Sequence, residues 1–137
     1  MPPARSVKSS TIPQSDADPA LRRGRILTAA AIKAAETLGL TQAQLAQIIG
    51  VSAPTVSRMR SGDYLLSEGR KEWSLAALFV RLYRSLESIV AGRPEDARAW
   101  LHSANRAFGD AQPAQLIADV QGLVHVVDYL DAARGPL

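Results

Sequence analysis

Apolar residues recur at intervals of three and four along most of the 137-residue chain, and no segment has the strict alternation of a half-buried strand. The pattern predicts helices over residues 21–38, 67–90, 113–117 and 122–133, another that opens at Pro94, and two short helices between residues 42 and 61. The β-branched run at 124–127 is ambiguous by itself, but its flanks favour a helix, with Leu123, Val126, Val127 and Leu130 on its buried side. The expected fold class is all-α.

Two of these helices have apolar faces that need partners. The helix over 21–38 is expected to end at Gly39 and to bury Leu21, Ile26, Leu27, Ile32, Ala35 and Leu38. The helix over 67–90 has a main apolar face, Leu75, Leu78, Phe79, Leu82, Leu86 and Ile89, and a second strip, Trp73, Val80 and Tyr83. One face suffices to pack a helix on its own domain. The second strip therefore needs either the C-terminal segment or the same helix in a twofold partner, and we favour a homodimer.

Residues 41–62 have the residue types of a DNA-reading helix-turn-helix at the required spacing. With Gln42 as the first position, Gly50 is the ninth, and the buried seam consists of Leu45, Ala46, Ile49, Val51, Val56 and Met59. A small residue such as Ala46 fits where the two helices cross, and Gly50 can take the positive φ that ends the first helix. Thr41 and Gln44 have the spacing of a capping box.

The second helix of this pair has a polar side without an acidic residue. Ser52 is expected to cap it, and Pro54 is tolerated in its first turn. The side chains expected on its exposed side, Ser52, Thr55, Ser57, Arg58 and Arg60, can donate hydrogen bonds to phosphates and base edges. The alternative is a plain αα-hairpin in a helical core.

Operator double-stranded DNA is the partner that this side of the helix predicts. The candidate DNA-binding residues are Gln42, Ser52, Pro54, Thr55, Ser57, Arg58 and Arg60. Arg58 is expected to read a guanine edge, while Gln42 and Arg60 hold phosphates. Because one helix reads only a few base pairs, a dimer on a two-part operator is expected.

Composition indicates a globular protein, with 47% hydrophobic and 21% charged residues. The absence of cysteine excludes disulfides and thiolate metal sites. No apolar run approaches the length of about 18 residues that a membrane span needs, and no signal peptide is apparent. We expect a soluble, cytoplasmic protein that contacts no membrane.

The net charge of +3 is unevenly distributed. Residues 1–90 carry 12 Lys and Arg against 7 Asp and Glu, whereas residues 91–137 carry 4 against 6. This suits a chain whose first part meets phosphates and whose last part meets something else. Residues 1–20, rich in Pro, Ser and Ala, are expected to form a flexible tail, in which Arg5 and Lys8 either touch the DNA backbone or are simply solvated.

No catalytic constellation is apparent. His102 and His125 stand 23 residues apart and have no obvious carboxylate, Ser or Cys partner. We therefore expect neither enzymatic activity nor a metal or cofactor.

The C-terminal segment carries a Trp-Leu pair, an Asn, a Phe-Gly, a Pro before a short helix, a Gly, and a last helix that ends in Arg-Gly. These residues are Trp100 and Leu101, Asn105, Phe108 and Gly109, Pro113, Gly122, and Arg134 and Gly135. In this order, after a helix-turn-helix, they resemble the MbcA/ParS/Xre antitoxin family over residues 25–135. Family members often have Thr-Pro before the short helix, where this chain has Gln112-Pro113.

The resemblance implies an Xre/Cro-like helix-turn-helix bundle followed by a small helical toxin-binding domain. It further implies an antitoxin of a type II toxin-antitoxin pair, which covers the active site of a RES-domain toxin that degrades NAD and represses the shared operon. The candidate toxin-binding residues are Trp100, Asn105, Phe108, Arg134 and Gly135, with Arg134 as the most direct plug. Trp100 and Phe108 are alternatively core residues, and Asn105 a turn cap.

The resulting division of the chain is a tail over residues 1–20, a DNA-binding domain over 21–66, a connecting and dimerisation helix over 67–90, and a toxin-binding domain over 91–137. Three alternatives stay open: a stand-alone transcriptional repressor with a C-terminal dimerisation domain, a phage-type repressor, and an enzyme. The neighbouring reading frame separates them, because only an antitoxin requires a toxin there.

Overall fold

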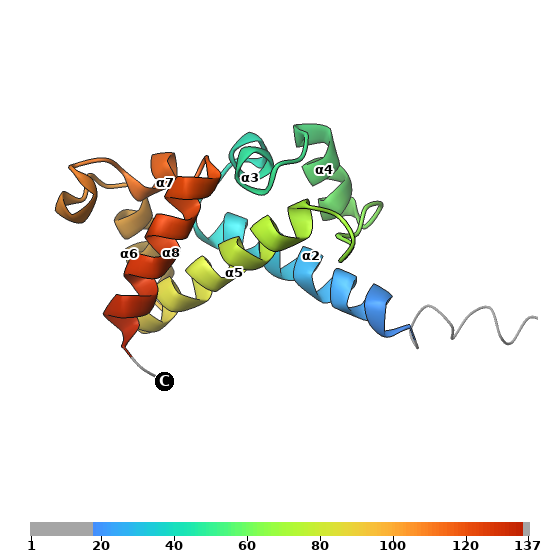
Figure 1. The fold of residues 1–137 in the computed structure, drawn as a ribbon, viewed down its shortest axis with the longest axis horizontal. Helices are drawn as coiled ribbons and strands as arrows, with labels where there is room; N and C mark the ends of the chain where they lie inside the picture. The colour runs from blue at the N-terminus through green and yellow to red at the C-terminus, as the bar shows by residue number, and fades with distance from the viewer. Residues whose placement is uncertain (1–17, 136–137) are drawn as a thin grey trace, which may run out of the picture.

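The computed structural model describes residues 18–135. The elements in this range are α2 (Pro19–Thr37), α3 (Gln42–Ile49), α4 (Ala53–Ser61), α5 (Glu72–Ile89), α6 (Pro94–Leu101), the 3-10 helix η1 (Arg106–Phe108), α7 (Pro113–Leu116) and α8 (Val120–Arg134) (Figure 1). Within these residues the only β pairing is one isolated bridge, so the predicted all-α fold is confirmed.

The first helix begins two residues earlier than the apolar pattern indicates. Asp18 caps it, since its Oδ1 accepts a hydrogen bond from the Ala20 N–H at 2.9 Å, and Pro19 occupies the first helical position. Most of the expected tail, including Arg5 and Lys8, lies outside the described residues.

Helix α5 is the central element. It packs against α2 and α3 on one side of the molecule and against α8 on the other (Figure 1). Phe79, Leu82 and Leu86 on its main apolar face are completely buried, as predicted. Ile89 continues this face by its spacing but is 43% exposed, so the face is not covered at that position. The helix also starts at Glu72 rather than at residue 67, since turns occupy the residues before it.

The second apolar strip expected on α5 does not form one surface. Trp73 and Val80 line a groove between α2 and α5, whereas Tyr83 lines a separate small pocket that also includes Thr37 and Gly92. Val80 is buried, and the two aromatic rings are half-buried. The strip is therefore split between two places.

Helices α5 and α8 are joined by polar contacts of Asp131 with Ser85 and Arg81, called the Asp131 clamp below, as well as by apolar packing. The Ser85 hydroxyl donates to Asp131 Oδ1 at 2.9 Å, and Arg81 forms an ion pair with Asp131 Oδ2 at 2.6 Å. Burial raises the pKa of Asp131, but the Ser85 hydrogen bond and the Arg81 ion pair outweigh it, and the net pKa is lowered. The apolar side of α8 consists of Leu123, Val126, Val127 and Leu130, all buried as predicted.

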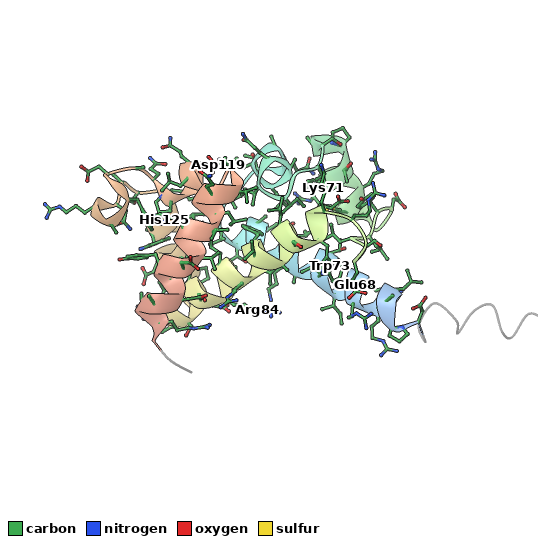
Figure 2. The ribbon with its side chains drawn as sticks, viewed as in Figure 1. Glu68, Lys71, Trp73, Arg84, Asp119 and His125 are labelled. Carbon is green, nitrogen blue, oxygen red and sulfur yellow. The ribbon has the colours of Figure 1, made fainter. Side chains whose placement is uncertain are left out.

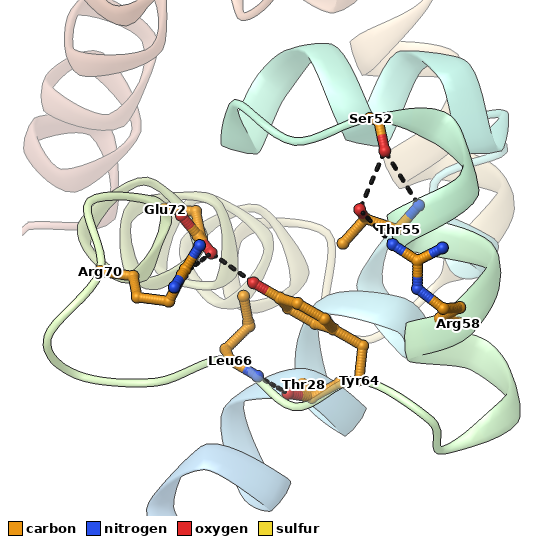
Figure 3. Close-up of polar contacts among 8 residues, drawn as sticks. All are labelled: Thr28, Ser52, Thr55, Arg58, Tyr64, Leu66, Arg70 and Glu72. Atoms are coloured by element: carbon orange, nitrogen blue, oxygen red, sulfur yellow. Dashed lines mark hydrogen bonds and ion pairs between the residues drawn. The ribbon is translucent and has the colours of Figure 1, made fainter.

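Helix α2 buries a narrow face of small residues. The prediction that Leu21 and Ile26 are core residues was wrong, because they are 41% and 58% exposed. Gly24 lies on the buried face, where a Cβ atom would stand 2.4 Å from the Leu66 carbonyl oxygen. The buried Thr28 hydroxyl donates to the Gly24 carbonyl at 2.7 Å. It also accepts the Leu66 N–H at 2.9 Å (Figure 3). This contact fastens the link between α4 and α5 onto α2.

The C-terminal helices dock on the end of α2. Arg98 donates to the Thr37 carbonyl at 3.0 Å, and His102 Nε2 lies 2.8 Å from the Leu38 carbonyl oxygen. These carbonyls end a helix and have no partner within it, so α6 supplies the cap. The cap joins the two halves of the chain through polar contacts.

The turn between α7 and α8 is closely packed. Asp119 Oδ1 accepts the Gly122 N–H at 2.8 Å and caps α8. A Cβ atom on Gly122 would stand 1.8 Å from the Leu116 carbonyl oxygen, so only glycine fits. Gln112 makes no side-chain cap at the start of α7, in keeping with its departure from Thr. None of the helices in residues 18–135 is long and apolar enough to cross a membrane.

Candidate functional site

The helix-turn-helix has the local geometry that its sequence predicts. Thr41 and Gln44 form a reciprocal capping box, with bonds of 2.8 and 3.0 Å. Gly50 takes φ 79° and ends α3, and Ser52 Oγ accepts the Thr55 N–H at 3.2 Å and caps α4. The seam residues are buried, apart from the half-buried Val51. The angle between α3 and α4 is thus fixed at both ends of the turn.

The exposed side of α4 differs from the prediction at one position. Ser52, Pro54, Ser57, Arg58 and Arg60 are exposed, but Thr55 is buried, with 9% of its surface accessible. The Thr55 hydroxyl lies 2.9 Å from Ser52 Oγ and accepts a hydrogen bond from Arg58 Nη2 at 3.0 Å (Figure 3). Thr55 therefore holds the Arg58 guanidinium near the N-terminal end of the helix.

Arg60 and Gln42, both expected to hold phosphates, have different surroundings. Arg60 forms an ion pair with Glu36 of α2 at 2.8 Å, and both side chains are about half exposed. Gln42 is half-buried at the first position of α3. A phosphate contact by Arg60 would compete with Glu36, whereas Arg58 makes no ion pair within residues 18–135.

A polar cluster that sequence reasoning missed holds the link after α4. The Tyr64 hydroxyl donates to Glu72 Oε2 at 2.6 Å, and Arg70 Nε donates to the same oxygen at 3.1 Å (Figure 3). The Tyr64 hydrogen bond is the main cause that lowers the pKa of Glu72, which is 7% exposed, and the same bond raises the pKa of Tyr64. The cluster fixes the path of the chain from α4 to α5.

Two of the C-terminal candidates, Asn105 and Phe108, have mainly structural positions. Asn105 Oδ1 accepts the Ala107 N–H at 2.9 Å, and the Asn105 N–H donates to the Ala111 carbonyl, so Asn105 caps η1 and closes its loop. Phe108 is 9% exposed. The other three candidates, Trp100, Arg134 and Gly135, are half-buried.

Arg134 lies at one end of the groove between α2 and α5. Its Nε atom is buried and has no hydrogen-bond partner within the described part of the chain. The groove has a volume of about 460 Å³ and is lined by Arg23, Ile26, Leu27, Ala30, Trp73, Ala77, Val80, Arg81, Arg84 and Arg134. Trp73 and Arg84, labelled in Figure 2, mark its extent along α5.

An aromatic cluster joins α8 to α6 and η1. Tyr129 stacks on Trp100 with ring centroids 6.3 Å apart, and it meets the Phe108 ring edge to face at 5.0 Å. His125 lies 5.3 Å from the Phe108 ring. Tyr129 is 40% exposed and His125 is exposed, so neither is a simple core residue. From the sequence, His125 was considered only as a catalytic or metal-binding residue, and Tyr129 was not considered.

No group of three or more His, Cys, Asp or Glu side chains in residues 18–135 has the arrangement of a metal site. His102 is engaged with the end of α2, and His125 with Phe108.

Comparison with protein-family models gives two matches in succession. Residues 19–81 match the antitoxin Xre-like helix-turn-helix domain, and residues 85–136 match the antitoxin Xre/MbcA/ParS C-terminal toxin-binding domain. A search of curated proteins finds no match.

Proposed function

Because the chain belongs to the Xre-like antitoxins, with a helix-turn-helix domain followed by a toxin-binding domain, we propose that it neutralises a RES-domain toxin that degrades NAD and represses their shared operon as a dimer. The observation that carries the proposal is the succession of these two domains in one chain. The chain acts by binding rather than by catalysis and needs no cofactor. Operator DNA and NAD are both cytoplasmic, which places the protein there.

The division of labour that we propose assigns residues 21–66 to DNA, 67–90 to connection and self-association, and 91–137 to the toxin. The C-terminal domain covers the toxin's active site. Trp100, Arg134 and Gly135 are partly accessible and so suit contact with a partner, while Asn105 and Phe108 contribute by holding the η1 loop in shape.

On the DNA side, Ser52, Pro54, Ser57 and Arg58 face the major groove. The Thr55 hydrogen bond keeps Arg58 close to the N-terminal end of α4, the part of a recognition helix that approaches the bases. A bidentate contact from Arg58 to guanine is worth about 1–3 kcal/mol of discrimination. Gln42 and Arg60 hold phosphates, and Arg60 must break its ion pair with Glu36 to do so.

The dimer contact that we propose uses the groove between α2 and α5. Trp73 and Val80, which the sequence assigns to a dimer surface, line the groove, and the adjoining Ile26 is 58% exposed. Packing of the same surface from a second copy would remove this apolar area from water. Ala77→Arg, which fills the groove without touching the main face of α5, is expected to convert the dimer into a monomer in light scattering.

Co-expression with the product of the neighbouring reading frame tests the function. A RES-domain toxin there stops growth when expressed alone, and co-expression with this chain restores growth and yields a complex that purifies as one species. Failure both to restore growth and to form a complex would overturn the antitoxin proposal and leave a stand-alone repressor.

A further inference from the structure

The side of α8 that faces away from α5 has an unusual composition for a solvated helix surface. At 100° per residue, it presents Val124 at one edge, Asp128 and His125 in the middle, and Tyr129 at the other edge. All four side chains are exposed, Val124 by 39% and Tyr129 by 40%. Figure 2 shows His125 on this side of α8, toward the η1 loop.

The edge of this side formed by Tyr129 is preorganised by neighbouring aromatic rings. Tyr129 is held between Trp100, on which it stacks at an interplanar angle of 20°, and Phe108, which it meets at 66°. The half-buried Trp100 ring also meets Phe108 edge to face at 6.1 Å. An aromatic side chain that is ordered by its neighbours and still exposed loses little conformational freedom on binding, which is the property of an interface hot spot.

We infer that this surface, defined by Trp100, His125, Asp128 and Tyr129 and called the aromatic platform below, is where the toxin docks. The inference rests on the proposed function and adds Tyr129, His125 and Asp128 to the contact. The occupant is the toxin rather than a second copy, because the match to the toxin-binding domain spans residues 85–136 and includes every platform residue.

Charge favours the same occupant. Residues 91–137 carry 6 acidic against 4 basic residues, and Asp128 makes no ion pair within residues 18–135. A site that holds the phosphates of NAD must itself present cations or N–H donors. The platform contributes one exposed carboxylate to such a contact, that of Asp128, which complements a site of this kind.

Three platform residues, His125, Asp128 and Tyr129, are exposed, whereas Arg134 is half-buried. Arg134 lies on the inner side of α8, at the end of the groove, with its Nε atom buried. To enter a toxin pocket it would have to leave that position. Most interfaces form with little backbone movement, which favours the surface that is already exposed.

The test measures the affinity of this chain for the purified product of the neighbouring reading frame, by titration calorimetry. Tyr129→Ala is expected to weaken the complex about 30-fold, as a hot-spot truncation does. Asp128→Arg is expected to weaken it at least about tenfold and to make the affinity less sensitive to salt. Ile89→Ala is the matched control, because Ile89 is 43% exposed but lies on α5 outside the platform, and it is expected to stay within about twofold.

Circular dichroism melts establish that each variant is folded, and Asp128→Arg, which changes only an exposed side chain, keeps the test decisive if Tyr129→Ala loosens the cluster. The inference is overturned if the unmodified chain binds and both platform variants bind equally well. It is also overturned if Arg134→Ala alone abolishes binding, or if the platform variants dissociate a homodimer instead. No binding by the unmodified chain overturns the proposed function itself.

Discussion

Replacing Gly122 by alanine would place a Cβ atom 1.8 Å from the Leu116 carbonyl oxygen. Contacts of this kind are not shorter than about 3.0 Å, so α7 and the start of α8 must separate by more than about 1 Å. Such overpacking costs about 1–3 kcal/mol and occasionally more. Alanine at a helical position without this contact is instead favoured by about 1 kcal/mol over glycine. The sign of the effect therefore reports on the packing.

We expect Gly122→Ala to lower the free energy of unfolding by about 2 kcal/mol, which corresponds to a fall in Tm of about 6–10 °C. Gly69→Ala is the control, since a Cβ atom there meets nothing within 4 Å, and its effect should stay within about 0.5 kcal/mol. The assay is urea unfolding followed by circular dichroism. A Gly122→Ala variant as stable as the unmodified protein would refute the close approach of α8 to Leu116.

Three further outcomes follow from the contacts above. Arg98→Ala removes the hydrogen bond to the Thr37 carbonyl and should lower the free energy of unfolding in urea by about 1–2 kcal/mol. Arg93→Ala breaks only an exposed ion pair with Asp96 and should lower it by under about 0.5 kcal/mol. Equal losses of stability for the two variants would contradict the role of Arg98 in docking α6 on α2. In gel shifts, Arg58→Ala should reduce the preference for operator over random DNA, while Arg60→Ala should weaken both alike, and identical patterns for the two variants would contradict this split. Asp131→Asn should lower the free energy of unfolding by about 1–3 kcal/mol at pH 7. Because the folded-state pKa of Asp131 is lowered, this loss of stability should persist down to about pH 4 and shrink as the pH falls further. A loss of stability independent of pH would count against the contact of Asp131 with Ser85 and Arg81.

The parts of the fold that the sequence predicted correctly depend on residues close together in the chain. The capping box of Thr41 and Gln44, the left-handed Gly50 and the Ser52 cap each involve a span of a few residues, so spacing alone identifies them. The buried side of α8 was predicted for the same reason, since Leu123 and its neighbours share one helical face.

The errors occur where packing between distant segments decides. Periodicity shows which residues share a face but not which part of that face a distant element covers, so Ile89 is exposed although it continues the apolar face of α5. Ile26 is exposed because it stands about 200° around α2 from the buried Gly24, on the side away from the core. Thr55 was predicted on the exposed polar side of its helix, but its side chain is buried. The start of α5 was missed because Lys71 makes no capping bond that a sequence could signal.

The candidate site was only partly predictable. The exposed residues of α4 were predicted correctly, and only Thr55 was wrongly included among them. The Arg60–Glu36 ion pair joins residues 24 positions apart, and the Arg98 contact with Thr37 joins residues 61 positions apart, so neither could be predicted from spacing. Tyr129 was missed because its exposure and its stacking on Trp100 depend on how α6 and η1 fold against α8. Distances between such residues are not encoded in local spacing.

The proposed neutralisation, in which this chain covers the active site of a NAD-degrading toxin, is measured most directly as the rate of NAD hydrolysis by the purified neighbouring toxin while the chain is added in increasing amounts. We expect the rate to fall in proportion to the added chain and to be abolished at a fixed molar ratio. An unchanged rate at a large molar excess of correctly folded chain would contradict it.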